Sequence, residues 1–76
     1  MKELLQTLAQ ALVDKPEEVK VSQIDGEKSV ILQLQVASDD VGKVIGKQGR
    51  IAKALRTIVK ASATKEGKRA IVEILD

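Results

Sequence analysis

The sequence predicts an α+β fold with elements in the order α-β-β-α-α-β, in which three helices pack on one face of a three-stranded mixed sheet. Three observations favour this fold class. Leucines recur at helical spacing near the N-terminus, two alternating segments flank Asp25-Gly26, and a last alternating segment follows a long helical pattern. The 76 residues are expected to form a single domain, residues 1–76.

The first helix is predicted over residues 2–13, where the spaced leucines are Leu4, Leu5, Leu8 and Leu12. Pro16 cannot extend this helix, and the residue before a proline is disfavoured in helical dihedrals. The element that follows should therefore be extended.

Two strands are predicted next, because apolar and polar residues alternate over residues 19–22 and again over residues 30–37. Asp25-Gly26 between them is a strong hairpin signal, since tight turns of this type need positive φ angles. The two strands should pair antiparallel. A final strand, residues 70–75, follows a crossover, so it is expected to run parallel to the second strand through a right-handed connection.

Two helices are predicted within that crossover. Ser38-Asp39-Asp40 is typical of a helix start, since short oxygen side chains accept hydrogen bonds from free amides and their charge suits a helix N-terminus. Gly46 and Gly49 interrupt the short helix, and a longer one runs over residues 49–63. The side chains expected in the core are Ile45, Ile51, Leu55, Ile58, Val59 and Ser62, whereas Val44 suits the core and a ligand groove equally.

Composition excludes several function classes. The chain has no Cys and no His, so disulfides, thiolate nucleophiles, the usual zinc ligands and the commonest general base are absent. The Asp and Glu residues cluster in turns and at helix starts, where turn and cap roles explain them. The sequence therefore predicts no enzymatic activity and no bound metal, cofactor or small-molecule substrate. Apolar runs are too short to cross a bilayer and the N-terminus is not a signal peptide, which favours a cytoplasmic protein with no membrane partner.

Charge is distributed unevenly along the chain. Residues 41–69 carry a net charge of +8, residues 1–40 a net charge of −4, and the whole chain +2. A strongly positive segment in a small folded domain suggests a polyanionic partner. A solvated helix face is the alternative that charge alone leaves open.

The most informative segment is Gly46-Lys47-Gln48-Gly49, hereafter the GKQG loop, between the two predicted helices. Glycine lacks a β-carbon, so a phosphodiester backbone can approach the main chain, and the amides at a helix start favour anions. A phosphate-binding P-loop is excluded because only three residues separate Gly42 from Gly46 and Gln48 follows Lys47. Lys43 and Lys47 also exclude a membrane-helix dimer motif.

Val44-Ile45 followed by the GKQG loop resembles the signature of KH domains, whose loop binds about four nucleotides. The order of elements resembles the bacterial, type II arrangement, and the whole chain is similar to the KhpA-like family of small bacterial RNA-binding proteins. This resemblance implies a type II KH fold that binds single-stranded RNA. The residues it assigns to the nucleic-acid site are Gly42, Lys43, Val44, Gly46, Lys47, Gln48, Gly49, Arg50 and Lys53.

The resemblance also implies a floor for the groove near Ile71 and Val72, and additional phosphate contacts from Lys65, Lys68 and Arg69. Many KH domains place a large aliphatic residue three positions after the last loop glycine, where this chain has Ala52 and Ile51 precedes it. Which of these two reaches the groove stays open. Arg56 and Lys60 are expected to be solvated, with an extended backbone track as the alternative.

The sequence leaves two functions open. The first is a post-transcriptional regulator or RNA chaperone, which the resemblance links to cell elongation and division. The second is an interaction or dimerisation module, acting as a homodimer or with a larger KH-containing partner of the KhpB (EloR or Jag) type. The intact GKQG loop and the positive segment favour RNA. Because aromatic residues are absent, bases cannot stack on an aromatic platform and would rest on aliphatic side chains.

Overall fold

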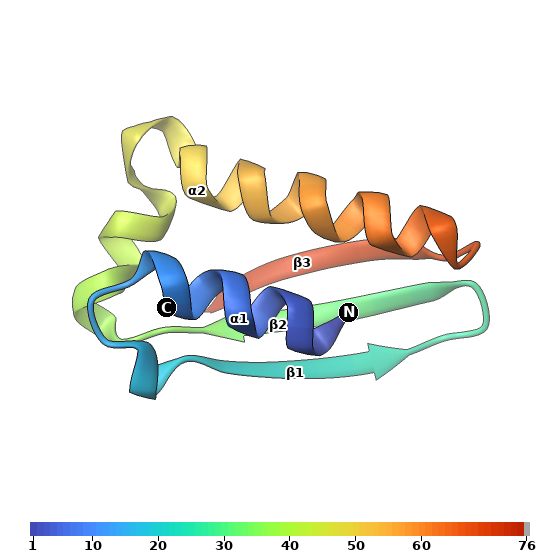
Figure 1. The fold of residues 1–76 in the computed structure, drawn as a ribbon, viewed down its shortest axis with the longest axis horizontal. Helices are drawn as coiled ribbons and strands as arrows, with labels where there is room; N and C mark the ends of the chain where they lie inside the picture. The colour runs from blue at the N-terminus through green and yellow to red at the C-terminus, as the bar shows by residue number, and fades with distance from the viewer. Residues whose placement is uncertain (76) are drawn as a thin grey trace.

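A computed structural model describes residues 1–75, with the side chain of Lys47 outside that description. The elements are α1 (Lys2–Leu12), a 3₁₀ turn η1 (Pro16–Glu18), β1 (Lys20–Asp25), β2 (Ser29–Gln35), α2 (Ser38–Lys65) and β3 (Arg69–Leu75). β2 is the central strand and pairs antiparallel with β1 and parallel with β3. The predicted fold class and strand directions are confirmed, and the helices lie on one side of the sheet (Figure 1).

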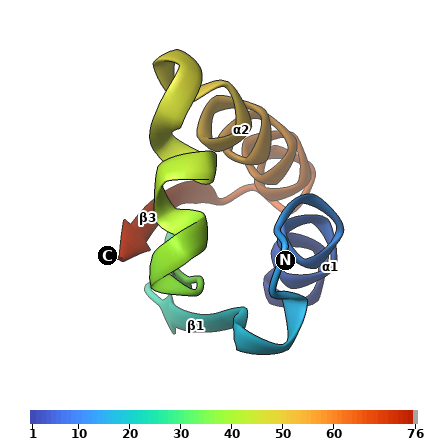
Figure 2. The same ribbon diagram turned by 90° about the vertical axis from the view of Figure 1, so that its left-hand side faces the viewer.

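α2 is one hydrogen-bonded element, but its direction changes at the GKQG loop. Gln48 and Gly49 have φ angles of 63° and 70°, the left-handed conformation that a right-handed helix cannot continue. Residues 38–47 (the short arm) run across one end of the sheet, and residues 50–65 (the long arm) run along it (Figure 2). The two predicted helices correspond to these arms.

Two turns show how glycine serves different purposes. The predicted hairpin exists, but the prediction of a positive φ angle at Gly26 was wrong. The N–H of Gly26 donates a hydrogen bond to the Ser29 carbonyl oxygen at 2.8 Å. A Cβ added at Gly26 would lie 2.9 Å from Ser29 Oγ, so the turn favours glycine because of close approach. Gly67 does have a positive φ, 71°, and ends α2. The amides of Gly67 and Lys68 donate to the carbonyl oxygens of Thr64 and Ala63, which is a Schellman motif.

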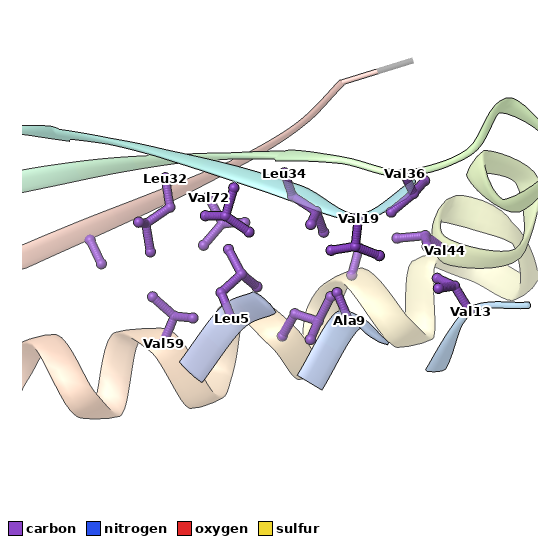
Figure 3. Close-up of a cluster of buried hydrophobic side chains, with 14 of the residues drawn as sticks. Leu5, Ala9, Val13, Val19, Leu32, Leu34, Val36, Val44, Val59 and Val72 are labelled. Atoms are coloured by element: carbon purple, nitrogen blue, oxygen red, sulfur yellow. The ribbon is translucent and has the colours of Figure 1, made fainter. Parts of the chain in front are cut away.

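The core is aliphatic throughout and lies between the helices and the inner face of the sheet (Figure 3). Leu5 of α1 and Val59 of the long arm pack opposite Leu32 and Val72 of the strands. The strand alternation is confirmed, since Val72 is buried and Ile71 exposed. The most deeply buried side chains are Leu5, Ala9, Val30, Leu32, Leu34, Asp40, Val44, Leu55, Val59 and Ala63.

The prediction of burial in the core was wrong for two residues. Ile45 is 52% exposed and Ile58 is 41% exposed. The inward face of the long arm is centred on Val59, so residues four and seven positions before it, Leu55 and Ala52, turn inward, while Ile58 is rotated by about 100°. The bulk of isoleucine suggested burial, but alanines occupy the inner face and leave the isoleucine at its flank.

Candidate nucleic-acid interface

The GKQG loop lies at the corner between the two arms of α2. Gln48 is exposed, and its backbone conformation is one that residues with a side chain rarely adopt. The side chain of Lys47 lies outside the described part of the structure. The positive φ angles of Gln48 and Gly49 turn the chain at this corner, so the long arm begins beside the loop, and the start of a helix is a place where an anion is stabilised.

Glycines also line the outer side of the short arm. A Cβ added at Gly42 or Gly46 would meet no atom within 4 Å, and neither residue has a positive φ. Neither the packing nor the backbone of this chain therefore requires glycine at these two positions. Their absent side chains leave the main chain open to close approach from outside, as binding to a phosphodiester backbone requires.

The residues that flank these glycines differ from the prediction in one respect. Val44 is 1% exposed and packs in the core, so it does not line a groove; its neighbour Ile45 presents the exposed aliphatic surface instead. The inward face of the short arm passes through Asp40 and Val44, which places Ile45 on a flank. Lys43, on the other flank, pairs with Asp14 at 3.0 Å. A nucleic-acid contact by Lys43 stays a prediction.

A groove of about 500 Å³ runs between the long arm and β3. Its lining combines cations with small and aliphatic residues: Arg56, Lys60, Thr64, Lys68, Arg69, Ala70, Ile71 and Val72. Lys68, Arg69, Ile71 and Val72 were expected on the floor and wall of a nucleotide groove, and the structure brings them together there. Lys65 is exposed at the end of α2 and is not part of this lining.

Arg56 and Lys60 are exposed, as expected, and both also line the groove. The spacing of these residues in the sequence indicates their shared position, because Arg56, Lys60 and Thr64 recur every four residues and therefore lie on one flank of the helix. Arg50 and Lys53 are exposed between the loop and this groove. Helix geometry puts Gly49 and Arg56 about 10 Å apart along the axis. The loop and the groove are therefore parts of one surface.

The choice between Ile51 and Ala52 is resolved by burial. Ala52 is 3% exposed and belongs to the core. Ile51 is half-buried against the core and lies about 140° around the helix axis from Arg56. Neither side chain reaches the groove beside β3.

β3 is an edge strand, so one row of its main-chain groups is not paired within the sheet. The carbonyl oxygen of Val72 belongs to this row, since it accepts a hydrogen bond from Arg56 Nε at 3.4 Å. Main-chain donors and acceptors of alternate residues therefore face the groove. Such groups can bond to the edges of bases that lie against the strand.

Positive charge on this surface is largely unneutralised. The ion pairs among residues 1–75 are Lys15–Asp39, Lys43–Asp14 and a longer Lys68–Asp25 contact at 4.0 Å. None of them involves the other cations of the loop and groove: Arg50, Lys53, Arg56, Lys60 and Arg69. Within the same residues no cluster of potential metal ligands is present, and no helix is long and apolar enough to cross a membrane.

The fold and the glycine loop define a KH domain with the type II order of elements. A family model for the KhpA/KhpB KH domain matches residues 2–74, and the chain belongs to this family.

Among curated relatives, the chain is 64% identical over 75 residues to "RNA-binding protein KhpA" of Clostridium acetobutylicum, covering 99% of this chain and 100% of the relative. The protein of the same name from Clostridium perfringens is 61% identical with the same coverage. That of Aquifex aeolicus is 50% identical, covering 100% of this chain and 96% of the relative. These names describe binding proteins, not enzymes, in agreement with the expected absence of catalysis. No solved structure matches the chain significantly.

Proposed function

We propose that this chain binds single-stranded RNA, with the phosphate backbone at the GKQG loop and the bases against the groove beside β3. The observation that carries the proposal is the left-handed conformation at Gln48 and Gly49, which turns the chain at the start of a long arm whose groove is lined by the cations Arg56, Lys60, Lys68 and Arg69. The names of the relatives support RNA as the polyanion. Phosphate contacts at the loop would set position, and groups in the groove would set base preference.

The groove suits bases without aromatic stacking. Ile45 and Ile71 offer exposed aliphatic surface, and the free edge of β3 offers main-chain hydrogen bonds. Affinity from one such surface should be modest. With three or four phosphates neutralised, the logarithm of the binding constant should fall with the logarithm of salt concentration at a slope of about −2 to −3.

The experiment is a filter-retention or mobility-shift assay on the double variant Lys47→Asp/Gln48→Asp. Both residues lie in the loop, so the fold should remain while RNA retention is lost. A matched control is Lys20→Asp/Ser22→Asp, which places the same charges on β1, the opposite edge of the sheet. Retention by the loop variant equal to that of the control would exclude the loop as the binding site.

A second function is pairing, either with another copy or with a KhpB-type partner. Leu4 and Leu12 of α1 and Ile58 of the long arm are 36–41% exposed, which favours a protein contact on the helical layer. Pairing would raise the avidity of weak single domains, so it is compatible with RNA binding. A role as a cytoplasmic post-transcriptional regulator or RNA chaperone connected with cell elongation and division belongs to this proposal. Sedimentation with and without RNA tests the pairing.

A further inference from the structure

A cluster of charged residues joins the short arm of α2 to the chain segment that follows α1. It comprises Asp14, Lys15, Asp39, Asp40 and Lys43, hereafter the junction cluster. Its centre is Asp40, which is only 1% exposed and is the only charged residue buried to this degree among the side chains that the structure describes.

The Asp40 carboxylate bonds to main-chain amides far away in sequence. Oδ1 accepts from the N–H of Asp14 at 3.1 Å, and Oδ2 accepts from the N–H of Lys15 at 3.0 Å. It does not cap its own helix: the N-cap is Ala37, and no side chain caps this N-terminus. The sequence suggested a cap for Asp40, and the structure corrects this to a link between two segments.

Besides this link, the short arm is held by the apolar contacts of Val44 and of the partly buried Val41. Of its described side chains, only Asp40 and Val44 are buried. Val44 packs beside Val13 and Val36 in the core (Figure 3). An apolar contact alone permits small rotations, whereas two charge-assisted hydrogen bonds fix both orientation and distance. Two exposed ion pairs, Lys15–Asp39 at 2.9 Å and Lys43–Asp14 at 3.0 Å, flank the same junction.

The loop lies at the other end of this arm. Gly46 lies six positions after Asp40, which is about 9 Å along a helix axis. A rotation of the short arm at Asp40 therefore displaces the loop amides relative to the groove beside β3. Burying a carboxylate is costly unless it is fully bonded, and here both oxygens have amide partners.

We infer that Asp40 is a positioning residue for RNA binding, which acts through the short arm by fixing the GKQG loop in its binding orientation. The inference rests on the proposed function. Loss of the link should leave a folded protein whose loop is correctly placed for only part of the time, and apparent affinity falls in proportion to that fraction.

The test compares Asp40→Asn with a destabilised control. Asn has nearly the same shape but accepts only one of the two amide hydrogen bonds, and its NH₂ group faces the other N–H. The control is Val21→Ala, a buried site in β1 on the edge of the sheet remote from β3. Binding to a labelled pool of random single-stranded 12-nucleotide RNA is measured where wild type and both variants are more than 95% folded.

Asp40→Asn should weaken binding about tenfold, since a hydrogen bond to a charged group stabilises an arrangement by roughly that factor or more. Val21→Ala should bind as wild type does. In amide NMR spectra of the free proteins, Asp40→Asn should move the Gly46 and Gly49 resonances. The resonances of Gly26, in the β1–β2 hairpin, and of Gly67, in the turn from α2 to β3, should stay in place, since both turns lie at the end of the molecule opposite the short arm (Figure 1).

Equal RNA affinity of Asp40→Asn and Val21→Ala, with unmoved Gly46 and Gly49 resonances, would overturn the inference. If wild type itself fails to bind while a positive-control RNA-binding protein does, the proposed function fails and the inference fails with it. Retained binding by wild type and by Asp40→Asn, but not by the Lys47→Asp/Gln48→Asp variant, would reject only the role of Asp40.

If Asp40→Asn does not fold, the variant Asp14→Asn/Asp39→Asn takes its place. It removes both exposed ion pairs of the junction cluster and leaves the core intact. It also adds two units of positive charge, which by electrostatics alone would tighten RNA binding. Moved Gly46 and Gly49 resonances with unchanged or weaker binding support the inference. Tighter binding with unmoved resonances contradicts it.

Discussion

Arg56 Nε donates a hydrogen bond to the carbonyl oxygen of Val72 at 3.4 Å, across the groove that separates the long arm from β3. This contact is long, so RNA can displace it at small cost. It holds the guanidinium against the edge strand β3. The contact therefore joins the long arm to a strand residue 16 positions away in the sequence.

Replacing Arg56 by Ala should weaken RNA binding severalfold. If Arg56 neutralises a phosphate, the slope of log affinity against log salt concentration should also become shallower by about one. Lys20→Ala removes the same charge from the opposite edge of the sheet and serves as the control. Equal salt slopes for the two variants, measured by fluorescence anisotropy, would remove Arg56 from the site.

The two loop glycines should respond differently to Ala. Gly49 has a φ of 70°, so Gly49→Ala should lower the free energy of unfolding by about 1–2 kcal/mol. Gly46 has a helical environment and open space for a Cβ, so Gly46→Ala should leave stability unchanged or raise it by up to about 1 kcal/mol. Gly46→Ala should nevertheless weaken RNA binding by blocking close approach. Urea denaturation and RNA titration separate these effects, and undiminished RNA binding by Gly46→Ala would show that the glycine surface is not used.

Variants of Lys43 and Asp14 distinguish two roles of Lys43, namely pairing with Asp14 in the junction cluster and direct contact with RNA. If Lys43 acts by pairing with Asp14, the variants Lys43→Ala and Asp14→Ala should weaken RNA binding by a similar factor, about two- to fivefold at most for an exposed pair, and the double variant should be no worse. If Lys43 instead contacts phosphate, Asp14→Ala should free it and tighten binding. Affinities of the four proteins in one buffer decide between the two roles.

The pair between Lys15 and Asp39 gives a pH prediction. The hydrogen bond from the Lys15 ammonium to Asp39, together with the charge of Asp39, raises the pKa of Lys15 above its usual 10.5. Because the pKa of Lys15 is higher in the folded state than in the unfolded state, its pair with Asp39 makes its full contribution to stability below pH 10.5. This contribution is lost as the pH rises through the folded-state pKa. Between pH 9.5 and 12, Tm should fall slightly more steeply for wild type than for Lys15→Met. Parallel curves would show that the pair does not contribute.

Much of the fold follows from local patterns, and the misses have physical causes. Alternation in the strands was predicted, and the structure has Val72 buried and Ile71 exposed, because a sheet with one covered face imposes a period of two. Helix faces were harder to predict, because Ala52 and Ala63 share the inner face of the long arm with Leu55 and Val59, and the small size of alanine gave no signal of this role.

The part of the candidate site that is formed by one local segment could be predicted from the sequence. The parts that are formed by contacts between distant segments could not. The GKQG loop is visible as a local motif. The link from Asp40 to the amides of Asp14 and Lys15 spans about a third of the chain, and nothing in either segment indicates its partner. The contact of Arg56 with Val72 is of the same kind, since only the parallel crossover brings the long arm over β3.

The most direct test of RNA binding at the loop and groove is an amide NMR titration with single-stranded RNA. The account predicts progressive, saturable shifts at residues 46–50 and 70–72, with little change over Lys20–Asp25 of β1. Shifts confined to α1 or to the uncovered face of the sheet, with the loop amides unmoved, would contradict it.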